Sequence, residues 1–380
     1  MPARHDGASS RHGHRRRAPW YAACLPTSRA GTTTYCIDQL RGQTRISDGP
    51  GSALSWTNLA VWSEARWKIA GERLAVKPGV RIERYGLSDE VVVDPRINIV
   101  QKLDDVIALR ESIGRYHQPP TPGDVDPAGG NPRLNSSHID QFSLAVDTRW
   151  SPSTMASVTG FFHQGNGIGV ELAESLGTTP PPANLGGLGA VMELLLEKEF
   201  RSDSFRENLG RARSYGVELS LRHQTDRWVM LASYTLSKAE RTDDPQLGIG
   251  WRPFELDQRH NLNLAASIVL GNWRVGARVQ LASGIPYTPR RVFGTPGFPG
   301  SGTQIDPWAG RVPTYGVLDL RVDRTWQRGW GDVTAFVDVQ NVTNRDNIEG
   351  RTFDARLGRD RDIVGLPVIP FVGIELTVGS

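Results

Sequence analysis

The sequence predicts an all-β fold, and more specifically a transmembrane antiparallel β-barrel. Three observations support this prediction: apolar and polar residues alternate in many short segments, short turns and long loops alternate between these segments, and tryptophans recur beside the short turns. Alternation with a period of two gives a strand one apolar and one polar face. A membrane barrel uses these faces for lipid outside and water inside.

The alternation is clearest at residues 261–281. Val275 and Val279 fall on one face of a segment, whereas Arg274 and Arg278 fall on the other. The preceding segment alternates in the same way and is joined to it by one glycine and one asparagine, which predicts a tight β-hairpin. The same pattern predicts about fourteen strands, at residues 59–69, 74–82, 97–99, 107–113, 142–150, 156–162, 217–221, 228–236, 261–270, 273–281, 318–322, 333–339, 348–353 and 372–378.

The connections between these segments differ in length in a regular way. Hairpin turns have about two to six residues, whereas longer connections occur at residues 117–136, 164–212, 239–259 and 285–314. Membrane barrels have short turns at one end and long loops at the other.

Aromatic residues gather at both ends of the segments. Those beside the short turns predict an aromatic girdle at one membrane interface, formed by Trp67, Trp150, Trp228, Trp273 and Trp326. Those beside the long loops predict a second band at the other interface, formed by Tyr85, Tyr116, Tyr287 and Tyr315.

The polar faces of the segments carry many charged side chains. Such side chains are unfavourable in a small packed core but suit the wall of a wide, hydrated lumen. We therefore predict that a set of polar residues faces the lumen: Glu218, Arg222, Arg274, Arg278, Asp319, Arg321 and Asp338.

The composition excludes several classes of protein. The 380 residues carry a net charge of only +3, which does not favour a nucleic-acid partner. No run of about 18 apolar residues occurs, so a helical membrane protein is excluded. We find no motif for a cofactor, a metal or an enzyme active site. The run from Asp257 to His260 favours a structural ion-pair cluster over a catalytic group, and Asp243-Asp244 favours a solvated loop over a calcium site.

Residues 1–50 differ from residues 51–380, where we expect the barrel. They are polar and rich in arginine, they show no strand or helix periodicity, and they lack the apolar stretch of a secretory signal. We therefore expect a disordered or mis-started segment. We interpret its Cys24 and Cys36 as incidental residues, with a disulfide in an oxidising compartment as the alternative.

Five stretches resemble the C-terminal barrel of TonB-dependent outer-membrane receptors. Each is weak alone, but together, in this order, they are specific: residues 211–221, 232–238, 254–262, 283–289 and 338–344. In the first of them, Gly216 permits a close approach of neighbouring backbone or a bend. The resemblance covers roughly residues 54–378.

The resemblance implies the C-terminal part of a barrel of about 22 strands, closed by an N-terminal plug. It also implies a place in the outer membrane of a Gram-negative bacterium, contact with its lipid, and uptake of a scarce ligand driven by the TonB complex. That ligand would be an iron chelate, cobalamin or an oligosaccharide.

No plug and no TonB box are recognisable, so we expect an N-terminally truncated form. The alternatives are a passive porin-like or structural outer-membrane barrel, a soluble all-β binding domain, and an inert truncated product.

Overall fold

The computed structural model describes residues 21–27, 32–45, 53–126, 130–171, 206–243, 250–293, 302–305, 308–354 and 359–378. Every regular element among them is a β-strand, and most belong to one antiparallel sheet. None of the described residues forms a helix long and apolar enough to cross a membrane.

Neighbouring strands of the large sheet follow one another in the chain, so the sheet is built by successive hairpins. Its path is β1 (Tyr21–Thr27), β2 (Thr32–Arg45), β3 (Ala53–Ile69), β4 (Leu74–Tyr85), β5 (Glu90–Lys102), β6 (Ile107–Gln118), β7 (Ser137–Ser151), β8 (Thr154–Glu171), β9 (Arg206–Gln224), β10 (Trp228–Thr242), β12 (His260–Leu270), β13 (Trp273–Ala282), β18 (Tyr315–Arg328), β19 (Gly331–Gln340) and β22 (Ile369–Val378).

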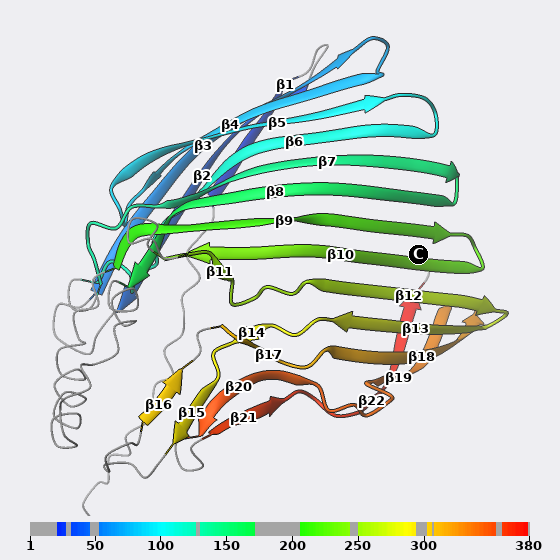
Figure 1. The fold of residues 1–380 in the computed structure, drawn as a ribbon. Helices are drawn as coiled ribbons and strands as arrows, with labels where there is room; N and C mark the ends of the chain where they lie inside the picture. The colour runs from blue at the N-terminus through cyan, green and yellow to red at the C-terminus, as the bar shows by residue number, and fades with distance from the viewer. Residues whose placement is uncertain are drawn as a thin grey trace, which may run out of the picture.

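Shorter strands lie in the long connections. β11 (Arg252–Pro253) pairs with β10, and three two-stranded sheets are formed by β14 (Pro286–Tyr287) with β17 (Gly310–Arg311), β15 (Arg290–Phe293) with β16 (Gly302–Ile305), and β20 (Ile348–Asp354) with β21 (Arg359–Val364). These small sheets lie toward the end of the large sheet from which the long connections leave, opposite the tight turns (Figure 1). The predicted asymmetry of short turns and long loops is confirmed.

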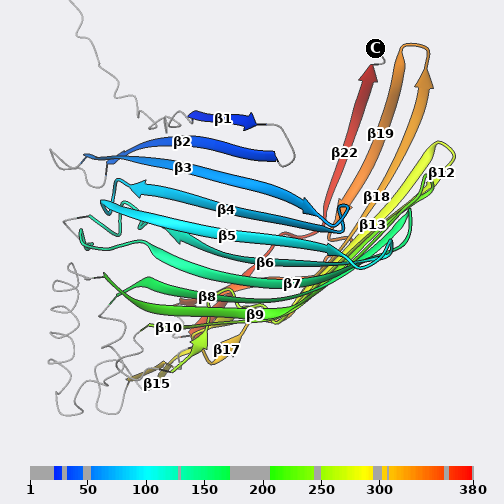
Figure 2. The same cartoon turned by 90° about the horizontal axis from the view of Figure 1, so that it is seen from above.

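The large sheet curves strongly, so that β12 to β22 stand at an angle to β3 to β10 and the two groups enclose a concave face (Figure 2). The described strands do not close into a ring, because β1 and β22 end the strand order and each has a single neighbour among them. The fold is therefore an open stretch of antiparallel barrel wall.

Every predicted segment is a strand, but two details differ from the expectation. The segment at 348–353 is β20, which pairs with β21 outside the wall instead of within it. In addition, β1 and β2 lie within residues 1–50, where we expected a disordered or mis-started segment, so the sheet reaches closer to the N-terminus. Neither strand shows the sustained apolar alternation that marks the others, which is why periodicity did not predict them.

The convex face carries a continuous apolar surface. Ile113, Phe142, Phe162 and Tyr215 occupy one cross-strand row over β6 to β9, and their side chains are exposed. Other exposed apolar residues follow at every second position, for example Leu219, which is 44% exposed. Burying such surface is favourable by about 25 cal/mol per Å². A patch of this extent is typical of a surface that contacts a membrane or partner.

The predicted tryptophans lie beside the tight turns of this surface. Trp150 is 66% exposed, and Trp67, Trp228 and Trp273 are also exposed, whereas Trp326 is half-buried. The guanidinium carbon of Arg324 lies 4.9 Å from the ring centre of Trp273 and 5.0 Å from that of Trp326. An arginine between two indoles is well suited to the polar edge of a bilayer.

The prediction of a second aromatic band at the loop end is wrong for Tyr85. This side chain is only 3% exposed, and its hydroxyl donates to the carbonyl oxygen of His117 at 3.1 Å. Tyr85 lies three residues after the exposed Ile82 in β4. Successive side chains of a strand point to opposite faces, so this odd separation places Tyr85 on the face opposite Ile82.

Candidate functional site: the charged concave wall

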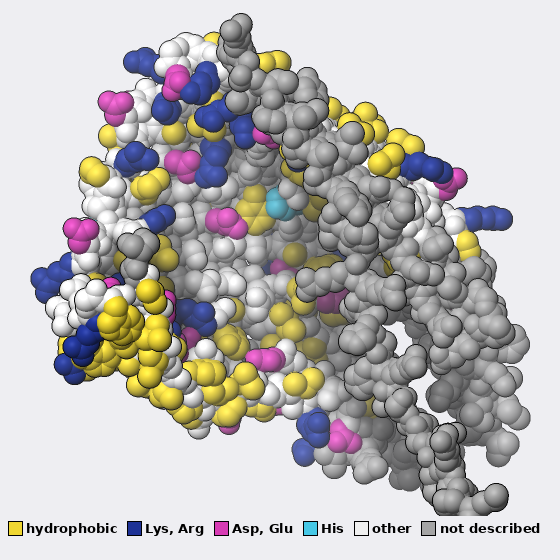
Figure 3. Space-filling model, turned by 180° about the vertical axis from the view of Figure 1, so that it is seen from behind, with side chains coloured by type: hydrophobic (Ala, Val, Ile, Leu, Met, Phe, Trp, Pro, Cys, Tyr) yellow, Lys and Arg dark blue, Asp and Glu magenta, His cyan; other side chains and the backbone are white. Residues whose placement is uncertain are grey.

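The concave face is hollowed and carries charged side chains among small polar ones (Figure 3). Strand alternation explains this arrangement, because each residue there is next in sequence to an apolar residue of the convex face. The residues predicted to face the lumen occupy this side of β9, β13, β18 and β19. The register places Arg278 opposite Asp319 and Arg321 opposite Asp338.

Arg278 and Asp319 form a direct ion pair across β13 and β18. Nε of Arg278 donates to Oδ2 of Asp319 at 3.0 Å. The arginine side chain is 58% exposed, whereas that of the aspartate is 12% exposed, so the carboxylate lies low in the wall and the cation covers it. The other carboxylate oxygen accepts the backbone N–H of Asn341 at 2.9 Å, which ties the wall to the connection that follows β19.

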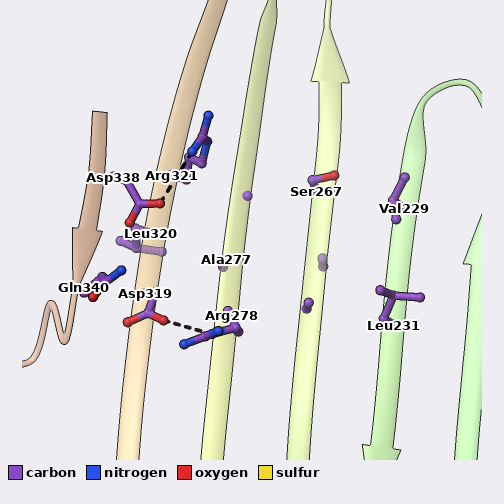
Figure 4. Close-up of a pocket in the computed structure, with 13 residues that line it drawn as sticks. Val229, Leu231, Ser267, Ala277, Arg278, Asp319, Leu320, Arg321, Asp338 and Gln340 are labelled. Carbon is purple, nitrogen blue, oxygen red and sulfur yellow. Dashed lines mark hydrogen bonds and ion pairs between the residues drawn. The ribbon is translucent and has the colours of Figure 1, made fainter. Parts of the chain in front are cut away.

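Arg321 joins two carboxylates and one aromatic ring. Its Nη2 donates to Oδ1 of Asp323 at 2.8 Å, and its Nη1 lies 3.8 Å from Oδ2 of Asp338. Its guanidinium carbon lies 4.0 Å from the ring centre of Phe336. Figure 4 shows Arg278, Asp319, Arg321 and Asp338 on adjacent strands along one side of a cavity.

Two of the cavities on this wall adjoin each other. The cavity of Figure 4 has a volume of about 290 Å³ and is lined by the four charged residues just named, by Gln340 and by small residues of β12 and β13. The second has a volume of about 530 Å³ and is lined by residues of β7 to β10, β12 and β13 that include Asp147, Met155 and Arg222. Leu231, Ala265 and Arg278 line both cavities, so the two adjoin around Arg278.

Of the predicted residues, the structure brings Arg222, Arg278, Asp319, Arg321 and Asp338 to these cavities. Glu218 and Arg274 lie on the same face, are exposed, and line neither cavity. Whether the face lines an aqueous lumen stays a proposal.

Sequence reasoning missed three residues of this wall. Leu231 is 47% exposed on the polar side of β10, where its apolar character contradicts the alternation. Asp147 pairs with Arg110 of β6 at 2.9 Å. Asp147 falls at a concave position of a segment that was predicted as a strand, so the period-two pattern contained the signal for it. Met155 precedes the predicted segment 156–162 and is an apolar residue at a concave position, so the pattern gave no signal for it.

A second charged cluster surrounds Asp257, at the loop end of the wall. Its side chain is 1% exposed and accepts the backbone N–H of Ala239 at 2.7 Å, Nε of Arg259 at 2.9 Å, and a hydrogen bond from Arg311. Burial alone would raise the pKa of Asp257, but these donors outweigh it and lower the pKa. The ion-pair cluster predicted at residues 257–260 is present, while His260 itself contacts the hydroxyl of Tyr234 at 2.7 Å.

Asp243, the described member of the Asp243-Asp244 pair, is held by arginines. Nε of Arg252 donates to its Oδ2 at 2.8 Å, and Nη2 of Arg241 lies 2.7 Å from its Oδ1. Burial would raise the pKa of Asp243, but the two arginines lower it overall. With both oxygens engaged by guanidinium groups, this carboxylate is a poor calcium ligand. No cluster of three or more metal-binding side chains occurs among the described residues.

An exposed apolar convex face, a charged concave face and long connections at one end together define the wall of a transmembrane β-barrel. A family model described as "TonB dependent receptor-like, beta-barrel" matches residues 21–342, and the chain belongs to this family. The match includes β1 and β2.

Solved structures share this fold. The ferripyoverdine receptor of the Pseudomonas aeruginosa outer membrane superimposes with a TM-score of 0.61 and 14% identity, over 93% of this chain and 47% of that one. The FrpB iron transporter from Neisseria meningitidis gives 0.62 and 10%, over 94% and 54%. The copper transporter OprC gives 0.63 and 13%, over 93% and 55%. The chain thus spans about half the length of these structures. No curated protein matches the sequence.

Proposed function

We propose that this chain is the barrel wall of an outer-membrane receptor that takes up a scarce ligand with energy from the TonB complex. The observation that carries the proposal is the pairing of an apolar convex face with a charged, hollowed concave face, in a chain that belongs to this receptor family. Membership in a family of receptors and transporters argues against catalysis on the ligand.

A metal-containing ligand is the best-supported class. The structures with the same fold include iron transporters, a ferripyoverdine receptor and a copper transporter. The wall itself offers cations, notably Arg222 and Arg278 beside the larger cavity. Exposed arginines suit anionic chelates, because a guanidinium binds a carboxylate through two parallel hydrogen bonds. Cobalamin and an oligosaccharide remain the other candidate ligands.

We expect the proposed uptake function to require a protein that is longer than the present chain. The chain spans about half of the receptors that share its fold, and among the described strands β1 and β22 each pair on one side only. An unpaired edge is unfavourable in lipid, since its N–H and C=O groups lack partners there. Further strands that pair with these edges would close the wall, and we propose an N-terminally truncated form of such a receptor. The intact mass of the native protein in the outer-membrane fraction tests this point, with 41.8 kDa expected for the chain alone.

The uptake experiment compares a deletion strain with strains that carry the native gene or an Arg222→Ala, Arg278→Ala double variant. Growth is measured under iron limitation with single ferric chelates, under copper limitation, and with cobalamin or oligosaccharides as the limiting nutrient. We expect the native gene to restore growth on one ligand, only while TonB is present, and the double variant to restore it poorly.

Growth that is restored without TonB would favour the passive porin-like or structural barrel instead. Recovery of the protein in the soluble fraction without detergent would favour a soluble all-β binding domain. Equal growth with and without the gene on every ligand would overturn the uptake function and leave an inert product.

A further inference from the structure

His117 and His138 lie directly opposite each other on the antiparallel pair β6 and β7. One further residue pair, Gln118 and Ser137, separates them from the connection between the two strands, so they stand near the base of that loop. The β6–β7 connection is at the loop end of the wall (Figure 1). Their ring centres are 5.3 Å apart and the ring planes are tilted by 42°. From this arrangement we propose that His117 and His138 bind one divalent transition-metal ion, such as Zn²⁺ or Cu²⁺, which clips the base of the loop. The proposal is independent of the proposed uptake function.

The distance between the rings fits a shared ion. Imidazole nitrogens bind Zn²⁺ at about 2.0–2.1 Å, and two such ligands at a tetrahedral angle bring the ring centres to roughly 5 Å from each other. The observed separation of 5.3 Å is close to this value.

Asp94 of β5 prepares His117 for this role. Its Oδ1 lies 2.5 Å from Nδ1 of His117, and its other oxygen accepts the backbone N–H of the same residue at 3.4 Å. A carboxylate can only accept a hydrogen bond, so Nδ1 carries the proton and the lone pair of the neutral ring is on Nε2. A carboxylate behind a histidine is the usual arrangement around metal-binding histidines, because it fixes the tautomer and makes the ring a better ligand.

The neighbouring charges leave the site available to a cation. Arg115, two residues before His117, would repel an ion, but Asp140 holds its guanidinium through two hydrogen bonds of 2.7 and 2.8 Å. This pairing also occupies both oxygens of Asp140, which explains why the site has two protein ligands and not three. Water would fill the remaining positions, and soft or borderline ions such as Zn²⁺ and Cu²⁺ prefer imidazole, whereas Ca²⁺ and Mg²⁺ prefer oxygen.

The test uses the full-length protein in detergent after removal of metal with a chelator. Cu²⁺ is added alone, and its binding is followed by competition with a coloured chelator and by electron paramagnetic resonance, which reports nitrogen ligands. The main variant is His138→Gln, because the side chain of His138 makes no hydrogen bond among the described residues and its loss should not disturb the fold. The matched control is His260→Gln, which removes a histidine elsewhere on the loop end.

We expect one tightly bound Cu²⁺ per chain with two nitrogen ligands in the native protein and in His260→Gln. His138→Gln should bind at least about 10-fold more weakly and show at most one nitrogen ligand. Asp94→Asn should weaken binding by about 10- to 100-fold while both histidines remain. Equal affinity in the native protein and His138→Gln, or a bound ion without nitrogen ligands, would overturn the proposal.

Discussion

Nε of Arg278 donates a hydrogen bond to Oδ2 of Asp319 at 3.0 Å, across the middle of the β13–β18 pair. The pair combines an exposed cation with a carboxylate that lies low in the wall. The carboxylate therefore depends on its partners more than the arginine does, since a poorly hydrated charge without partners is unfavourable.

Removal of the arginine should destabilise the wall. In Arg278→Ala, the backbone N–H of Asn341 is the one hydrogen-bond donor left to Asp319 within the described part of the chain. We expect the free energy of unfolding in lipid vesicles to fall by about 1–3 kcal/mol, as for other buried polar groups that lose a partner. The control is Arg274→Ala, which removes an exposed arginine from the same face of β13 that has no ion pair among the described residues. This variant should change stability by less than about 0.5 kcal/mol. Equal losses of unfolding free energy in Arg278→Ala and Arg274→Ala would contradict a stabilising role for the Arg278–Asp319 ion pair.

The two faces of β9 can be distinguished by placing arginine on each. Leu219 is exposed on the convex face, whereas Glu218, its neighbour in sequence, is exposed on the concave face. If the convex face contacts lipid, Leu219→Arg should lower the free energy of unfolding in vesicles by about 2–4 kcal/mol. Glu218→Arg should be nearly neutral. A larger effect at residue 218 would mean that the faces are assigned the wrong way round.

The close contact predicted at Gly216 is confirmed and gives a second stability test. A Cβ atom there would overlap the carbonyl oxygen of Leu236 and lie 2.9 Å from Cα of Ser237, both in the backbone of β10. Gly216→Ala must push β9 and β10 apart, and we expect a loss of about 1–3 kcal/mol. At Gly160 a Cβ would meet nothing within 4 Å, so Gly160→Ala should be tolerated. The test compares the thermal unfolding of the two variants. Similar melting temperatures for Gly216→Ala and Gly160→Ala would argue against close packing of β9 and β10 at Gly216.

Acid should selectively weaken the cluster around Asp257. The pKa of this carboxyl is lowered in the folded protein, because its hydrogen bonds outweigh the effect of burial. A lowered pKa contributes stability that is fully present above the pKa of the unfolded chain and is lost as pH falls through the folded pKa. The unfolded value is about 3.9, so the contribution should be complete near neutral pH and should disappear in strong acid.

The measurement compares the native protein with Asp257→Asn by thermal unfolding, from about pH 3 to about pH 7. The difference between them should shrink as the pH falls. Asp105→Asn, in an exposed turn, serves as the control and should follow the native protein throughout. A difference that does not change with pH would indicate that the charge of Asp257 does not stabilise the fold.

Local patterns predicted the strands and their faces, because alternation depends only on neighbouring residues. Arg278, Asp319, Arg321 and Asp338 were placed on one side of the wall for this reason. Their pairing could not be predicted, because it depends on the register between β13, β18 and β19, and register is a relation between strands. The cavity-lining role of Leu231 was missed for a related reason, since an apolar residue at a polar position is explained only by its neighbours across strands.

The long connections of this molecule leave the wall at one end, while the wall itself keeps a continuous register over most of its length, with shifts in the β7–β8 and β8–β9 pairs. Inserting a single residue into a strand, where no bulge absorbs it, would move every following side chain to the opposite face, so that the convex face would become charged and the concave face apolar. Inserting residues into a loop changes no register at all. The loops can therefore vary in length and sequence without disturbing the two faces, while the wall tolerates substitutions better than changes of length.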